Sequence, residues 1–157
     1  MLSDVICSKN STFCKSSHKL IVTEKPSVAQ AIGKAMGITK RRDGYLEGGN
    51  YLVSWCVGHL VELAPPGSYD PKLTKWSKAD LPILPKTWQY LVSTSTQRQF
   101  EVLRSLMARP DVDQLVCATD AGREGELIFR LVYHQCGCAK PFTRLWISSM
   151  EDAAIRD

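Results

Sequence analysis

The stretch VCATDAGREGELIF, residues 116–129, decides the fold of this 157-residue chain. It belongs to an apolar run, DQLVCATD at 113–120, which is typical of a parallel strand covered on both faces. The run stops at Asp120, and REGELIFRLVYHQCG then begins with acids in its first turn and ends at a glycine, as a helix does. The apolar face that we expect of this helix consists of Leu127, Ile128, Leu131 and Val132.

The same order of elements occurs near the start of the chain. KLIVTE, residues 19–24, is a β-branched run that predicts a buried strand. A helix should follow, with capping-box spacing at Ser27 and Gln30 and a C-terminal stop at Gly37. Alternating strands and helices predict an α/β fold, a mainly parallel sheet flanked by helices on both faces. Ligands of such folds bind beyond the carboxyl ends of the strands.

The segments between these two strand–helix units predict different kinds of structure. GGN within residues 44–63 predicts a hairpin turn, and residues 65–88 carry five prolines and two tryptophans, which favours an irregular connection held by aromatic anchors. Residues 96–109 form a helical pattern with Phe100, Leu103 and Met107 on one stripe, and Pro110 ends it. FTRLWISS, residues 142–149, predicts a further strand before a helix that the end of the chain cuts off. We therefore expect a fragment of a longer protein.

Length and composition limit the number of domains, the class of partner and the cellular compartment. The 44% hydrophobic content is that of an ordinary globular domain, which we place at 19–157 after a disordered leader at 1–18. The net charge of +4 permits a polyanionic partner without requiring one. No apolar run approaches the roughly 18 residues of a membrane span, and residues 1–19 lack the apolar core of a signal peptide. Six cysteines without a CxxC pair predict a reducing compartment, the cytoplasm, and CGC at 136–138 predicts a helix-ending turn.

Carboxylates mark the ends of two predicted parallel strands. Glu24 ends the first, Asp120 ends the later one, and Glu124 opens the next helix. Two charges about 4 Å apart repel by about 4 kcal/mol at an effective dielectric near 20, so such acids share a proton or bind a cation. An all-oxygen site with room for water suits Mg²⁺. The alternative is that Asp120 is a turn residue and that Glu124 only complements the helix dipole.

Two segments add a family resemblance. LIVTEKPSVAQAI and CATDAGREGELIFR resemble the two signature segments of the Toprim domain of type IA DNA topoisomerases, in the topoisomerase III branch. GHLVELAPP, YDP, KW, LPILP and RLWISS resemble that branch's intervening segments in the same order, from about Lys19 to Asp157. The resemblance implies a Rossmann-like Toprim fold with a β-hairpin and irregular insertion. It also implies Mg²⁺-dependent relaxation or decatenation of DNA by transient single-strand breakage through a 5′-phosphotyrosine.

The resemblance also implies roles for single residues. Glu24 matches the family's catalytic glutamate, which assists proton transfer at the scissile phosphate, and Lys25 matches the lysine that approaches that phosphate. His59 matches a histidine that contacts DNA, and Arg123 falls in a segment that supports the acids or a phosphate. Taken singly, His59 is typical of a turn, Lys25 of a solvated surface and Arg123 of a pair with a neighbouring carboxylate.

The family's Asp-x-Asp-x-Glu metal motif matches Asp120, Gly122 and Glu124. Gly122 is a departure, because the usual pattern has a second aspartate there and this chain has no side chain. We expect a Mg²⁺ site of modest affinity built mainly on Glu24 and Asp120, with water or Glu124 completing it.

The family's nucleophilic tyrosine has no match here. It belongs to a later cleavage domain, so we expect single-stranded DNA and the rest of the same polypeptide as partners and no activity from this chain alone. The tyrosines that lack the family's active-site context are Tyr45, Tyr51, Tyr69, Tyr90 and Tyr133. Two alternatives stay open, a stand-alone metal-dependent Toprim nuclease and a non-catalytic nucleic-acid-binding module.

Overall fold

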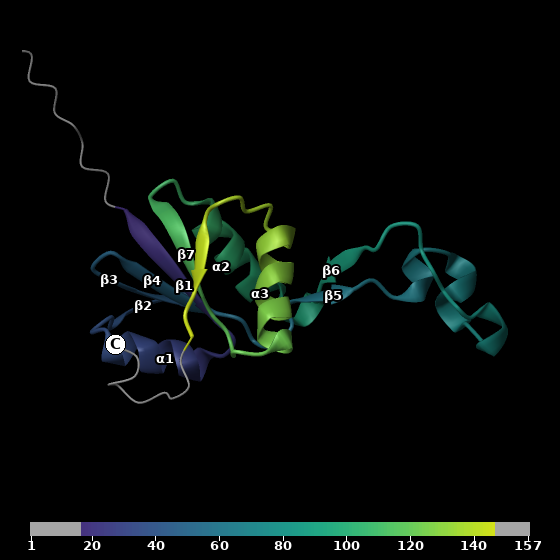
Figure 1. The fold of residues 1–157 in the computed structure, drawn as a ribbon, viewed down its shortest axis with the longest axis horizontal. Helices are drawn as coiled ribbons and strands as arrows, with labels where there is room; N and C mark the ends of the chain where they lie inside the picture. The colour runs from purple at the N-terminus through teal and green to yellow at the C-terminus, as the bar shows by residue number, and fades with distance from the viewer. Residues whose placement is uncertain (1–16, 147–157) are drawn as a thin grey trace, which may run out of the picture.

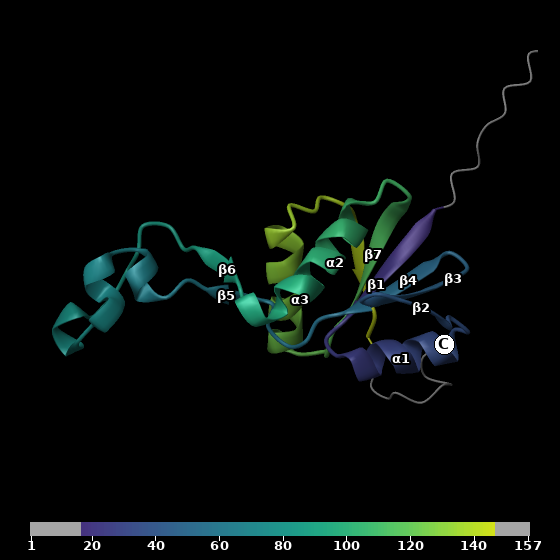
Figure 2. The same ribbon diagram turned by 180° about the vertical axis from the view of Figure 1, so that it is seen from behind.

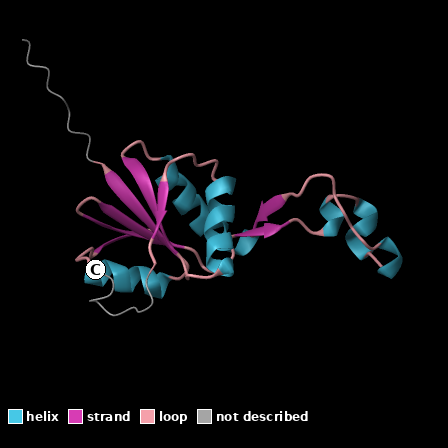
Figure 3. Cartoon of the chain, viewed as in Figure 1, coloured by secondary structure: helices cyan, strands magenta, loops and turns pink. Residues whose placement is uncertain are grey.

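A computed structural model describes residues 17–146, in which six strands form a central sheet in the order β2-β3-β4-β1-β7-β8 (Figures 1 and 3). Strand β1 pairs in parallel with β4 and with β7, and β7 pairs in parallel with β8. Strands β2, β3 and β4 are antiparallel neighbours, so GGN does form the predicted hairpin turn. The strands are β1 His18–Thr23, β2 Lys40–Arg42, β3 Tyr45–Gly48, β4 Tyr51–Trp55, β7 Val112–Ala118 and β8 Phe142–Arg144.

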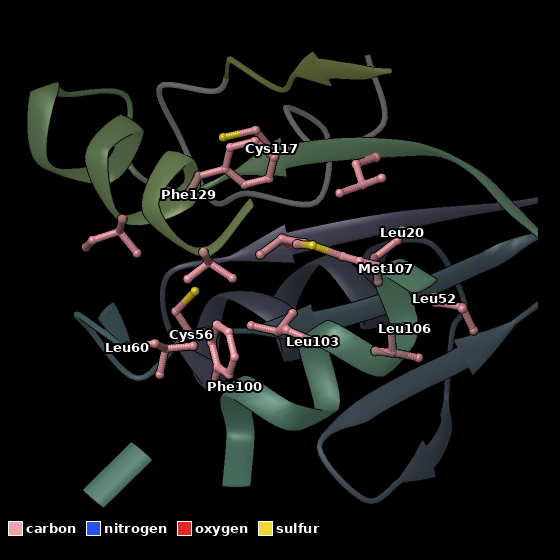
Figure 4. Close-up of a cluster of buried hydrophobic side chains, with 14 of the residues drawn as sticks. Leu20, Leu52, Cys56, Leu60, Phe100, Leu103, Leu106, Met107, Cys117 and Phe129 are labelled. Carbon is pink, nitrogen blue, oxygen red and sulfur yellow. The ribbon is translucent and has the colours of Figure 1, made fainter. Parts of the chain in front are cut away.

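Helices cover both faces of this sheet (Figures 1 and 2). Helix α1, Pro26–Ala35, packs on the face to which Ile21 points, whereas α2, Gln97–Ala108, and α3, Arg123–Gln135, pack on the face of Leu20 and Val22. This alternation along one strand divides the core into two clusters, the larger of which is drawn in Figure 4. The predicted α/β fold with a mainly parallel sheet is confirmed.

Two helix details differ from the sequence-based expectations. Leu127 is exposed and Phe129 is fully buried, because the side of α3 that meets the sheet runs through Gly125, Ile128, Phe129 and Val132. Ser27 does not cap α1. Pro26 already occupies its first turn, and Lys25 is the N-cap residue without any side-chain capping bond.

An arm projects from the side of the sheet domain (Figure 1). Its base is the antiparallel pair β5, Val61–Leu63, and β6, Tyr90–Val92, and its outer part contains three short 3₁₀ helices. The expected aromatic anchors do not reach the core, because Trp76 and Trp88 are both about half exposed and residues 65–91 contribute no buried side chain. Within the arm, Trp88 meets Tyr69 edge-on, with ring centroids 6.5 Å apart. The 3₁₀ helices of the arm are η1 Pro66–Ser68, η2 Pro71–Lys75 and η3 Lys78–Asp80, and η4, Thr94–Thr96, leads into α2.

The remaining expectations concern the end of α3, membrane-spanning helices and the two ends of the chain. The CGC segment does end α3, with Cys136 as the C-cap residue and Gly137 at a φ of 62°. Within residues 17–146 no helix is both long and apolar enough to cross a membrane. The predicted leader lies outside the described residues except for Ser17 and His18, the latter in β1, and the predicted last helix lies wholly outside them.

Candidate functional site

Four parallel strands deliver their following residues to one rim of the sheet. Thr23 at the end of β1 is paired with Trp55 of β4 and with Ala118 of β7, and Cys117 of β7 is paired with Arg144 of β8. The segments that leave these strands therefore begin side by side. They carry Glu24 and Lys25, His59, Asp120 to Glu126, and Arg144 to Trp146.

Lys25 connects the two strand-end carboxylates. Its Nζ lies 3.5 Å from Glu24 Oε1 and 3.8 Å from Asp120 Oδ2. The Glu24 side chain is only 12% exposed, whereas those of Lys25 and Asp120 are more than half exposed. The Thr23 hydroxyl donates a 3.0 Å hydrogen bond to the Lys25 carbonyl, which holds the turn after β1. Two carboxylates thus already share one cation at this rim.

Glu124 lies in contact with a different partner. Its Oε1 is 3.4 Å from His59 Nε2, and its side chain is 78% exposed. His59 reaches this position because Gly58, directly before it, has a φ of 76°, a backbone conformation that favours glycine. The structure therefore groups Glu24, Lys25 and Asp120, and places His59 with Glu124 as a second pair at the same rim.

Two glycines of the rim loop have opposite surroundings. Gly122 is the N-cap residue of α3 with an extended φ of −141°, and a Cβ there would meet nothing within 4 Å. A Cβ on Gly125 would lie 2.1 Å from the Asp120 carbonyl oxygen. Gly125 is therefore required for α3 to lie against the end of β7, whereas the position of Gly122 has room for a side chain.

Arg144 is a site residue that sequence reasoning missed. Its Nη2 donates to the carbonyl oxygens of Thr119, at 3.2 Å, and Asp120, at 2.6 Å. Its Nη1 lies 2.8 Å from Glu126 Oε2. The Arg144 side chain is 20% exposed, and its guanidinium fixes the backbone that presents Asp120. The sequence carried one signal for it, a charged residue within the largely apolar run predicted as a strand at 142–149.

The two remaining charged residues of this loop differ in their contacts. Glu126 pairs with both Arg144 and Arg130, at 2.8 Å and 2.7 Å, so it supports the loop and lies apart from the Glu24 group. Arg123 is exposed, and its side chain makes no hydrogen bond or ion pair with the part of the chain that the structure describes. It is free to contact a ligand.

The donor set at the rim suits a cation with few protein ligands. Between residues 17 and 146 no three His, Cys, Asp or Glu side chains are close enough to form a metal site on their own. Mg²⁺ is commonly held by one or two carboxylates, with water and substrate phosphates completing its shell, and Glu24 with Asp120 meets that requirement.

Burial raises the pKa of the nearby Cys56 thiol to about 12, so that cysteine is a neutral core side chain.

The fold and the rim together define a class, an α/β domain that brings carboxylates and a lysine to the carboxyl ends of its parallel strands. The Toprim domain model matches residues 19–150, and the chain belongs to the Toprim domain family. The similarity extends to proteins named DNA topoisomerase 3. Identity is 47% over 141 residues with that of Bacillus cereus and 43% over 141 residues with that of Bacillus subtilis, 90% of this chain in each case. It is 45% over 138 residues, 88% of the chain, with that of Staphylococcus epidermidis. The chain spans about 19% of the length of these relatives.

Proposed function

We propose that this chain is the Toprim domain of a type IA DNA topoisomerase of the topoisomerase III branch, acting on DNA in the cytoplasm. The observation that carries the proposal is the Glu24–Lys25–Asp120 group at the carboxyl ends of β1 and β7, where two carboxylates and a lysine lie together. The identity of 43–47% with proteins named DNA topoisomerase 3 supports it. The reaction is the transient breakage and resealing of a single strand of DNA.

The rim residues would position a scissile phosphate. Lys25 and His59 would supply positive or hydrogen-bonding groups toward the phosphate, and Arg123, whose guanidinium has no partner within residues 17–146, would contact the strand farther along the same rim. Glu24, largely enclosed next to the Lys25 ammonium, would assist proton transfer at the departing sugar oxygen, a role generally worth about 10²–10⁴-fold in rate. Holding the reacting groups in line accounts for most of the remaining rate enhancement.

Glu24 and Asp120 would hold Mg²⁺, with Glu124 or water completing the site. When bound, the ion supplies charge stabilisation to the phosphate oxygens. Lys25 would then turn from its two carboxylates to the phosphate, because an ammonium and a divalent cation repel each other in the same position. Its half-exposed side chain leaves that movement open.

The nucleophilic tyrosine would come from another part of the polypeptide. Two of the tyrosines here have structural contacts, since Tyr133 Oη donates to the Lys140 carbonyl at 2.8 Å and Tyr69 Oη accepts from the Gln89 N–H at 2.9 Å. We expect the 157-residue chain to leave supercoiled plasmid unrelaxed and to form no covalent DNA adduct. Relaxation by the purified chain, with an adduct that survives denaturant, would refute this division of labour.

The nuclease alternative gives a different result in a simple assay. With Mg²⁺ and labelled single-stranded DNA or RNA, a stand-alone Toprim nuclease would hydrolyse the strand, and Glu24→Ala would abolish cleavage. We expect no hydrolysis by the wild type or by Glu24→Ala. Cleavage that depends on Glu24 would replace the topoisomerase assignment with the nuclease one.

A further inference from the structure

A hollow of about 440 Å³ lies at the β8 end of the rim, lined by the loop that follows Asp120 and by the end of β8. Trp146, two residues beyond β8, lines it and is 72% exposed, although an indole of this size is normally packed. The hollow has no part in the proposed chemistry of Glu24 and Lys25. Its lining consists of Ala121, Gly122, Arg123, Glu126, Arg144 and Trp146.

Ion pairs and hydrogen bonds hold two of the charged residues that line the hollow, and the net charge of the lining is positive. Arg144 is bound to two backbone carbonyls and to Glu126, and Glu126 is bound in addition by Arg130. Glu126, the only carboxylate among the lining residues, is therefore paired with two arginines. Arg123 lines the same hollow and has no partner within residues 17–146. The flat, apolar indole of Trp146 and the free guanidinium of Arg123 line one hollow, which suits a ligand that is both aromatic and anionic.

We propose that this hollow binds an unpaired nucleobase of single-stranded nucleic acid, stacked on the Trp146 indole, with Arg123 contacting the adjoining phosphate. Base–aromatic stacking tolerates any base, because every base has a π face, and an arginine next to the stack adds attraction to the backbone. The site lies at the same rim as Lys25 and His59, so one strand would pass both. The inference rests on the proposed function for the class of ligand and adds a subsite that anchors the strand away from the reacting phosphate.

Binding of the 157-residue chain to a fluorescein-labelled eight-nucleotide oligothymidylate, followed by anisotropy at low salt, tests the subsite. Trp146→Ala should weaken binding by about 5- to 150-fold, the range that stacking of one base supplies, and Trp146→Phe should retain most of the affinity. Trp76→Ala, at a half-exposed tryptophan of the arm, is the matched control and should leave affinity unchanged. An oligonucleotide with an abasic position at the stacked base should lose affinity for the wild type and lose little for Trp146→Ala.

The outcomes separate this inference from the proposed function. Equal binding by wild type and Trp146→Ala would overturn the subsite and leave the topoisomerase assignment standing. No binding by the wild type would overturn both. Unchanged oligonucleotide binding combined with loss of self-association of Trp146→Ala in sedimentation would assign the indole to a protein contact, which also overturns the subsite.

Discussion

At the scale of single residues, Gly122 and Gly125 show how two glycines in one loop meet different requirements. Gly125 lies under the Asp120 carbonyl, where a methyl group would overlap the oxygen at 2.1 Å. Gly122 has an extended backbone and open space where a side chain would go. The absence of a carboxylate at 122 is therefore not imposed by the packing around that position.

Gly125→Ala should destabilise the fold. The added carbon forces α3 away from the end of β7, and overpacking of this kind costs about 1–3 kcal/mol in the free energy of unfolding. Gly122→Asp is the matched control. It should leave stability within about 1 kcal/mol of the wild type, since an aspartate is at least as good an N-cap residue as glycine. Urea denaturation of both variants checks this, and equal stability of Gly125→Ala and wild type would contradict the assigned close contact.

Gly122→Asp should also strengthen Mg²⁺ binding. The new carboxylate has space to turn toward Asp120, and affinity for hard divalent cations rises with the number of charged ligands, here on the order of tenfold. Calorimetric titration with Mg²⁺ compares the variant with the wild type. An unchanged affinity would mean that position 122 cannot contribute a ligand.

At the scale of elements, the unit β7–α3–β8 is fastened at the rim by the Arg144 guanidinium. It joins the end of β8 to the carbonyls after β7 and to Glu126 in the first turn of α3. The Thr119 hydroxyl adds a buried 2.8 Å hydrogen bond to the Gly125 carbonyl. The loop between β7 and α3 is thus held from both sides.

Arg144→Ala should cost about 2–3 kcal/mol in the free energy of unfolding, because removal of a largely enclosed charged donor leaves two carbonyls without their partner and Glu126 with Arg130 alone. Arg130→Ala removes the other arginine from the same Glu126 and is the control. Its exposed i,i+4 pair and its place 4.7 Å from the Phe142 ring centroid contribute about 1 kcal/mol or less. Urea denaturation that gave equal losses for the two variants would show that Arg144 is an ordinary surface ion pair.

The strands and helices of this unit were predictable from the sequence, whereas their cross-links were not. A continuous apolar run followed by a 3.6-residue period indicates β7 and α3 whatever surrounds them. The orientation of α3, with Phe129 inward and Leu127 outward, depends on how closely Gly125 lets the helix approach the sheet. The role of Arg144 depends on β8 pairing with β7, a contact that no local pattern encodes.

At the scale of the whole molecule, the sheet domain and the arm contribute differently to stability. Both core clusters lie between the sheet and its three helices, and the arm's outer residues add no buried side chain to them. Sequence patterns predicted the sheet and a hairpin or irregular insertion. The projection of the arm could not be predicted, since its prolines and tryptophans have no period that assigns them a face.

Replacing residues 64–89 by a short Asn-Gly turn between β5 and β6 should leave the domain folded. The strands pair from Val61 with Val92 to Leu63 with Tyr90, so a two-residue turn joins them without changing their register. We expect a single cooperative thermal transition within a few degrees of the wild type, because the removed residues bury almost nothing. Loss of that transition in a circular dichroism melt would show that the arm is part of the core structure.

The central claim is that the Glu24–Lys25–Asp120 rim handles a divalent cation and a DNA phosphate together. The most direct test is the affinity of the chain for single-stranded DNA as Mg²⁺ is raised at constant ionic strength. The wild type should bind more tightly with Mg²⁺, and Glu24→Gln and Asp120→Asn should lose this gain while Glu62→Gln, at an exposed position of β5, keeps it. If Mg²⁺ instead weakens binding equally in all four proteins, as counterion competition at a purely basic surface requires, the rim is no metal-assisted phosphate site and the claim fails.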